Sequence, residues 1–156
     1  PVLDAALACA ESTGGPAAAL ELPDGRIITG KTSKLLGASA ALLLNALKEL
    51  AGIDHEKHVI SPDAIEPIQK LKVNYLGSKN PRLHTDEVLI ALSVSAAMDK
   101  YAQLALEQLP KLKGCQAHTS VMVSSVDMKQ FKKLSIQATF EAKYEKKAVF
   151  FRKKVV

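Results

Sequence analysis

The sequence contains no tryptophan and few other aromatic residues. Aromatic residues make up 4% of its 156 residues, whereas apolar residues as a whole make up 47%. We therefore expect a core built from leucine, alanine, valine and isoleucine. So few aromatic side chains also argue against a platform for single-stranded nucleic acid, where bases stack on aromatic rings.

Long hydrophobic runs are also missing. The nearest approach, Leu35 to Leu44, is shorter than the roughly 18 residues of a membrane helix. Pro1 to Ala10 contains Asp4 and lacks the basic start of a signal peptide. We therefore expect a cytoplasmic protein with no membrane partner. Because the chain begins with proline rather than methionine, we also expect it to be a piece of a longer protein.

Cysteine is scarce, and its positions exclude the common cysteine-based sites. Cys9 and Cys115 have no metal-ligand spacing, and two reduced thiols in a cytosolic chain are expected rather than a disulfide. His55 and His58 do not share a strand face, so they do not predict a metal site either. The sequence therefore predicts neither a metal nor a cofactor.

The length of the chain is that of one domain, residues 1–156, and its pattern alternates strands with helices. A hairpin is expected around Pro23-Asp24-Gly25. The other expected elements are a helix over Leu3–Ala10, a helix from Thr32 or Ser33 to about Leu50, a strand over His58–Ile60, helices starting at Ser61, Thr85 and Asp99, a strand over Ala117–Val126, a helix over Asp127–Leu134 and a strand over Ile136–Tyr144. This order predicts an α/β domain with a mixed central sheet layered by helices.

One of these helices is apolar on nearly every side. Leucines crowd the segment from Leu35 to Leu47, and only Ser39 and Asn45 interrupt them. A helix of this kind is buried against a sheet and neighbouring helices. The segment is therefore expected to form the centre of the core.

The segment from Gly25 to Thr32 reads GRIITGKT, which fits the phosphate-loop pattern G-x-x-x-x-G-K-[ST]. Its β-branched interior favours extended backbone, however, and Gly25 already belongs to the hairpin turn. A nucleotide-binding loop is therefore disfavoured. A weaker hypothesis is that Lys31, Thr32 and Ser33 form a helix N-terminus that binds an anion, and the alternative is a plain helix cap.

A second polar group lies at the start of the helix expected at Thr85. His84, Asp86 and Glu87 follow Asn80 and Arg82, and together they are candidates for a ligand site at the end of the sheet. Helix capping explains the same carboxylates without a ligand. His118 is either a hydrogen-bonded histidine of the sheet or one wall of the same site.

Basic residues concentrate at the C-terminal end. The net charge is +5, and many of the 21 lysines and arginines lie between Lys129 and Lys154, including the basic tail 145–156. A basic end of this kind is either a solvated surface or a contact for nucleic acid.

Four stretches carry a resemblance to a known family: Glu21–Ser33, Leu35–Ala40, Asn45–Ile53 and Asn80–Glu87. Together they resemble the C-terminal region of an uncharacterised bacterial family, domain of unknown function 1846 (UPF0371-type proteins). The resemblance covers the chain from Pro1 to about Tyr144. It implies a cytoplasmic protein about three times this length.

The resemblance also implies a cytidine-deaminase-like fold, a three-layer α/β/α sandwich with a mixed central sheet. In a zinc deaminase the first ligand and the catalytic glutamate begin the buried helix, but Leu35 to Ala41 contains no His, Cys or Glu. Asp63 and Glu66 stand where the paired thiolates are expected. Deaminase chemistry is therefore expected to be lost even if the fold is shared.

The sequence contains no complete catalytic set, so it leaves enzymatic activity open. The first interpretation is a non-catalytic domain that packs against N-terminal domains of the same protein or forms a homo-oligomer. The second is a binding or enzymatic domain for a phosphorylated or nucleotide-like molecule, lined by Lys31, Thr32, Ser33, Asn80, Arg82 and His84. The third is nucleic-acid binding through the basic C-terminal end.

Overall fold

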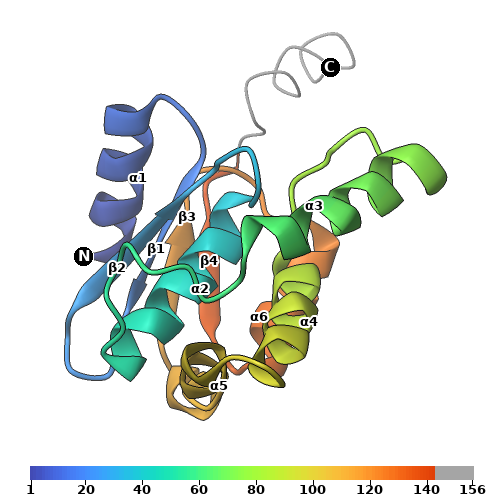
Figure 1. The fold of residues 1–156 in the computed structure, drawn as a ribbon. Coiled ribbons are helices and arrows are strands. Elements are labelled where there is room, and N and C mark those ends of the chain that lie inside the picture. The colour runs from blue at the N-terminus through green and yellow to red at the C-terminus, as the bar shows by residue number, and fades with distance from the viewer. Residues whose placement is uncertain (143–156) are drawn as a thin grey trace, which may run out of the picture.

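The computed structural model describes residues 1–142. Its elements, in chain order, are α1 (Val2–Thr13), β1 (Ala17–Glu21), β2 (Ile27–Lys31), α2 (Ala38–Ala51), α3 (Pro62–Lys70), the π-helical segment η1 (Leu71–Tyr75), α4 (Thr85–Ala96), α5 (Lys100–Leu106), the 3₁₀ segment η2 (Leu109–Leu112), β3 (Gln116–Thr119), α6 (Ser125–Lys133) and β4 (Gln137–Phe140). The described residues thus form a mixed α/β fold (Figure 1). The basic tail 145–156 lies outside them.

The four described strands form one sheet in the order β2-β1-β3-β4. β1 is antiparallel to both β2 and β3, and β3 is parallel to β4. The predicted hairpin is confirmed, with Ala17 paired to Lys31 at its open end. Gly25 permits the turn because its φ of 91° lies in the left-handed region that other residues avoid.

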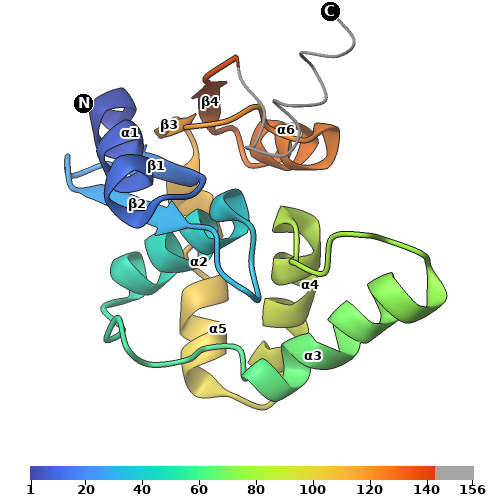
Figure 2. The ribbon, with the colours of Figure 1, turned by 90° about the horizontal axis from the view of Figure 1, so that it is seen from above.

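Helices cover the sheet on both faces near the hairpin. α1 packs along β1 and β2 on one face, and α2 crosses the same strands on the other (Figures 1 and 2). Gly30 makes this close approach possible, since a Cβ atom there would lie 2.3 Å from the backbone nitrogen of Leu42. The sheet and α2 are therefore in contact with almost no side chain between them at this point.

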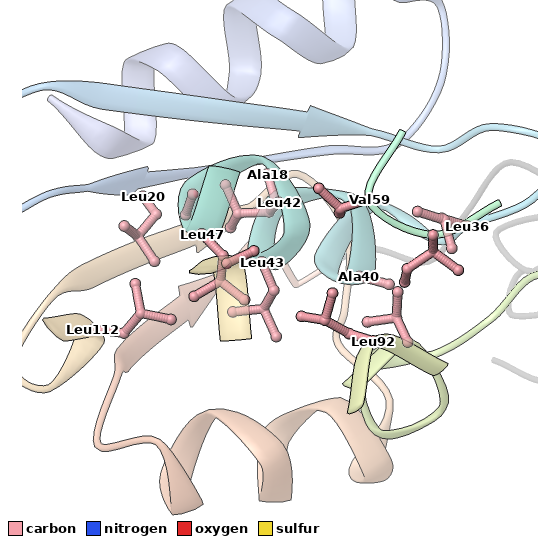
Figure 3. Packing of buried hydrophobic residues seen from close by; sticks show 14 of the residues in the cluster. Ala18, Leu20, Leu36, Ala40, Leu42, Leu43, Leu47, Val59, Leu92 and Leu112 are labelled. Carbon is pink, nitrogen blue, oxygen red and sulfur yellow. The ribbon is translucent and has the colours of Figure 1, made fainter. Parts of the chain in front are cut away.

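The predicted buried helix is confirmed as the centre of the core. Leu42, Leu43 and Leu47 of α2 are fully buried, and Figure 3 shows them among side chains from β1, α4 and the η2 segment. Full burial of each such leucine contributes roughly 1.5–3 kcal/mol relative to exposure. The core is thus mainly aliphatic, as the low aromatic content of the sequence predicts.

The start of that helix was predicted wrongly. α2 begins at Ala38 after Gly37, not at Thr32 or Ser33. Before it, the chain pairs with a distant segment: the Leu83 N–H donates to the Leu35 carbonyl, and the Gly37 N–H donates to the Leu83 carbonyl (2.9 and 3.1 Å). This pairing keeps the chain extended for several residues longer than the local sequence indicates.

Other differences from the prediction have local causes. His58 to Ile60 forms no strand; Val59 and Ile60 are buried, but no neighbouring strand pairs with them in residues 1–142. β3 ends at Thr119, short of the predicted Val126, and Ser124 caps the next helix by accepting from the Asp127 N–H (3.2 Å). The helix starts predicted at Ser61 and Asp99 are confirmed, and both side chains accept from backbone N–H groups of their helices.

Candidate functional site

Three helices begin around one cleft at the end of β3. They are α2, α4 and α6, and the loops that precede them supply most of the walls. The cavity has a volume of about 110 Å³. It is lined by Pro16, Thr32, Gly37, Ala38, Ser39, Asn80, Arg82, Leu83, His84, Thr119, Val121, Met122, Val123, Ser124 and Asp127.

The N-terminus of α2 is uncapped. Gly37 precedes the helix and offers no side chain, and the N–H groups of Ala38, Ser39 and Ala40 have no acceptor among residues 1–142. The first N–H groups of a helix carry a partial positive charge and need a partner. This end of α2 therefore presents unused donors to the cleft.

The Ser39 hydroxyl lies at the same place. Its residue is only 7% exposed, it lines the cleft, and it makes no hydrogen bond with any described residue. Its oxygen is not among the fully buried polar atoms of the described residues, so the hydroxyl is open to the cleft. Ser39 thus adds one more unpaired donor to those of the helix backbone.

Asp127 joins the starts of α4 and α6. Its Oδ1 accepts from the Thr85 backbone N–H (3.0 Å) and from the Thr85 hydroxyl (2.6 Å). Its Oδ2 lies 3.8 Å from Nδ1 of His84. The carboxylate therefore caps α4 from a different helix and faces the imidazole with its second oxygen.

The two groups shift each other's pKa. The Asp127 carboxylate raises the pKa of His84 above its ordinary value, against the opposing effect of the ring's partial burial. Burial would raise the pKa of Asp127, but hydrogen bonding to His84 and Thr85 outweighs it and lowers that pKa. His84 therefore carries more positive charge near neutral pH than an ordinary histidine.

Arg82 forms the opposite wall. Its Nε donates to the Ser33 carbonyl (2.6 Å), and its backbone N–H donates to Oδ1 of Asn80 (3.1 Å). The terminal guanidinium nitrogens form no ion pair or hydrogen bond within the described residues. One edge of the guanidinium is thus fixed, and the other stays free to bind an anion.

Of the predicted ligand residues, Thr32, Asn80, Arg82 and His84 line the cleft. Lys31 does not, because it is the last residue of β2, next to Gly30, which faces α2. Successive side chains of a strand point to opposite faces, so Lys31 points away from α2. Ser33 contributes only its carbonyl, as the acceptor for Arg82.

The helix N-terminus predicted at Lys31–Ser33 is absent, because α2 begins at Ala38. The phosphate-loop pattern from Gly25 to Thr32 was already disfavoured by its β-branched interior. Residues Ile27–Lys31 of that pattern form the extended strand β2. Its second glycine, Gly30, accommodates the backbone of Leu42 rather than a phosphate.

The remaining candidates have structural partners. Glu87 accepts from the backbone N–H of His84 (2.8 Å) and pairs with Nζ of the buried Lys72 (2.8 Å). Asp86 accepts from the N–H of Glu87 (2.8 Å). The cap of α4 is thus His84 with Glu87, whereas Thr85, expected as the cap, is the first helical residue.

His118 lies outside the cleft lining. It is buried on β3, with Nδ1 2.6 Å from the Thr139 hydroxyl and Nε2 2.8 Å from Oε2 of Glu141. These contacts connect β3 to Thr139 of β4 and to Glu141, which follows β4. The interpretation of His118 as a hydrogen-bonded histidine of the sheet fits this placement.

The sequence analysis missed Ser39, Ser124 and Asp127. Each has an ordinary local role, as a helix residue, a cap and a first-turn carboxylate, and only the fold brings them together. Among residues 1–142, no three His, Cys, Asp or Glu side chains gather as a metal site would require.

A second feature is a set of exposed apolar residues on η1, α4 and the start of α5, and just after η1 and α4. Most of the exposed large hydrophobic residues in the described part lie here: Leu71, Val73, Tyr75, Leu76, Ile90, Val94, Met98 and Tyr101. α3 and η1 extend from the body beside α4 (Figure 2). We call these eight residues the apolar surface.

Comparison with known proteins finds close relatives. The family model described as domain of unknown function DUF1846, C-terminal, matches residues 1–150. A UPF0371 protein of Corynebacterium glutamicum (strain R) is 58% identical over 96% of this chain, and one of Streptococcus pyogenes serotype M5 is 50% identical over 87%. The matches span only 30% and 28% of those relatives. No helix in the described residues is long and apolar enough to cross a membrane.

Proposed function

This chain belongs to the family described as domain of unknown function DUF1846, C-terminal, whose curated relatives are about three times its length, and on that premise we propose that it is a non-catalytic packing domain of a longer bacterial protein. Its partner is the remainder of the same polypeptide. The observation that carries the proposal is the apolar surface, and in particular the outer face of α4.

α4 is apolar on both of its faces. Val88, Ala91 and Leu92 are buried in this domain, whereas Ile90 and Val94 are 63% and 69% exposed. No charged residue occurs from Val88 to Met98. A helix that is apolar all round is typical of a protein interior, so the outer face of α4 is expected to be covered in the full-length protein.

The exposed positions are also aligned. Ile90 and Val94 lie four residues apart on one side of α4, and the exposed Met98 follows in the turn just after the helix. Burying side chains of this size contributes roughly 1.5–3 kcal/mol each. Covering these three residues together with Tyr75 and Leu76 would therefore favour packing of a second domain against this surface.

The finer architecture is part of the same proposal. We propose a three-layer α/β/α sandwich with cytidine-deaminase-like topology in the cytoplasm. The element order supports it, because a hairpin, a buried helix and further α/β units follow one another. The lack of zinc ligands at the start of α2 supports a role without deaminase chemistry.

A chimera tests the packing function. In it, this chain replaces the matching C-terminal segment of the Corynebacterium glutamicum relative, which is 58% identical. Val94→Glu is expected to lower the melting temperature of the chimera clearly while leaving the isolated chain unchanged, because Val94 is exposed only in isolation. The matched control is Val126→Glu, which puts the same side chain into the first turn of α6, outside the apolar surface.

Equal melting temperatures for the chimera with and without Val94→Glu would contradict the proposal. Dimerisation of the isolated chain that Val94→Glu abolishes would instead assign the surface to a homo-oligomer. Nucleic-acid binding remains a prediction: Lys129, Lys132 and Lys133 are exposed on α6, but the rest of the basic end lies outside the described residues.

A further inference from the structure

We propose that the cleft at the N-terminus of α2 binds the terminal phosphate group of a small phosphorylated molecule, held by the first N–H groups of α2, the Ser39 hydroxyl and the Arg82 guanidinium. This inference is independent of the packing function. It concerns a different surface and a ligand of a different class.

The first observation is that three N–H groups at the start of α2 have no acceptor among residues 1–142. Ala38, Ser39 and Ala40 lie in succession at an end that no side chain caps. The other two helices at the cleft are capped by side chains: Ser124 caps α6, and Asp127 accepts from Thr85 at the start of α4. Among these three helices, α2 is the one whose first three N–H groups all lack an acceptor in the described residues.

Ser39 supplies an independent observation. The residue is more than nine-tenths buried, yet its hydroxyl has no partner within the described residues and borders the cleft. The oxygen is not among the fully buried polar atoms of the described part, so its remaining access is to the cleft. The hydroxyl is thus free to donate to a group that enters the cleft.

The charged residues around the cleft indicate that the ligand group is an anion. Arg82 has free guanidinium nitrogens in the wall, and Asp127 is already engaged by Thr85 and His84. The pKa of His84 is raised by the same carboxylate, so the ring adds positive charge near neutral pH. With the Arg82 guanidinium and a histidine whose pKa is raised against one engaged carboxylate, the cleft favours an anion.

Geometry distinguishes phosphate from carboxylate. The donors around the cavity are of three kinds: backbone N–H groups of a helix end, a hydroxyl and a guanidinium. The three oxygens of a terminal phosphate accept from several directions at once, whereas a carboxylate presents two oxygens in one plane. A cavity of about 110 Å³ matches a headgroup of this size, and the rest of the molecule would extend past the exposed Met122 and Asn80 at the mouth.

Inorganic phosphate is the probe that tests the site. In ¹H–¹⁵N spectra of this chain at constant ionic strength, phosphate is expected to shift the amide signals of Ala38, Ser39 and Ala40 in a saturable way. Arg82→Gln is expected to weaken binding by about tenfold or more, as loss of a charged hydrogen-bond partner does. Ser39→Ala is expected to weaken it several-fold.

Lys31→Gln is the matched control. This variant removes one positive charge, as Arg82→Gln does. Lys31 belongs to the phosphate-loop pattern but lies outside the cleft lining, so phosphate affinity should be unchanged. The spectrum of each variant reports whether it is folded, and Arg82→Lys tests the same contact with the charge retained. Absence of saturable shifts in the wild type would overturn the proposal. So would equal shifts with acetate, or an equal loss of affinity in Lys31→Gln.

Discussion

Thr85 and Asp127 join two helices that start 40 residues apart in the chain. Thr85, the first residue of α4, donates both its backbone N–H and its hydroxyl to Oδ1 of Asp127 in α6, at 3.0 and 2.6 Å. Both residues are buried. The carboxylate thus fixes the relative position of the two helix ends that form one side of the cleft.

The first prediction follows from this contact. Asp127→Ala leaves two buried donors of Thr85 without an acceptor, so we expect the free energy of unfolding to fall by about 2–4 kcal/mol. Urea denaturation measures the change. Asp63→Ala is the control, because Asp63 also lies in a first helical turn but is exposed; it should cost less than about 1 kcal/mol. Equal losses of unfolding free energy for the two variants would show that the Thr85–Asp127 contact contributes no more than an exposed carboxylate in a first helical turn.

The second prediction concerns pH. Because Asp127 raises the pKa of His84 above 6.5, protonated His84 stabilises the fold fully below pH 6.5, and this contribution is lost as the pH rises through the raised pKa. The pKa of Asp127 is lowered below 3.8, so its contribution is present above pH 3.8 and is lost as the pH falls through the lowered pKa. The pair therefore stabilises the domain most between these limits.

An NMR titration of the His84 ring checks this relationship. The wild-type ring is expected to titrate above 6.5, and in Asp127→Asn its pKa should fall, because the carboxylate is gone and the opposing burial remains. A His84 pKa that is the same in both proteins would contradict the pairing.

The third prediction concerns the contact between β2 and α2. In Gly30→Ala the new Cβ would lie 2.3 Å from the backbone nitrogen of Leu42 and 2.6 Å from its Cα, so strand or helix must move. We expect a loss of about 2 kcal/mol or more in unfolding free energy. Gly15→Ala is the control, since nothing lies within 4 Å of its Cβ position. A Gly30→Ala protein as stable as Gly15→Ala would be inconsistent with the close packing described.

Much of this fold could be predicted from the sequence, because turn residues and capping side chains act on backbone only a few residues away. The Pro23-Asp24-Gly25 turn formed a hairpin, and Ser61 and Asp99 cap helices as their side chains indicate. The leucines of α2 are buried as their distribution around the helix requires. In each case, the residues that decide the structure lie next to it in the chain.

The start of α2 and the cleft depend instead on contacts between distant segments. Leu36 forms a bridge with Leu83, 47 residues away, and this pairing delays the helix to Ala38. Asp127 reads as a first-turn carboxylate of its own helix, yet its acceptor atoms serve Thr85. Local patterns carry no information on such pairings, so the anion-binding hypothesis from the sequence fell on Lys31–Ser33, whereas the proposed site lies at the N-terminus of α2.

Hydrogen exchange of α4 tests the packing function most directly. The backbone amides of Val88–Met98 would be compared by mass spectrometry in the isolated chain and in the chimera with the Corynebacterium glutamicum relative, at concentrations where both are monomeric. The packing function predicts markedly slower exchange of this segment in the chimera, with α1 exchanging alike in both. Exchange of Val88–Met98 at the same rate in both proteins would show that the apolar face of α4 stays uncovered, which contradicts the proposed function.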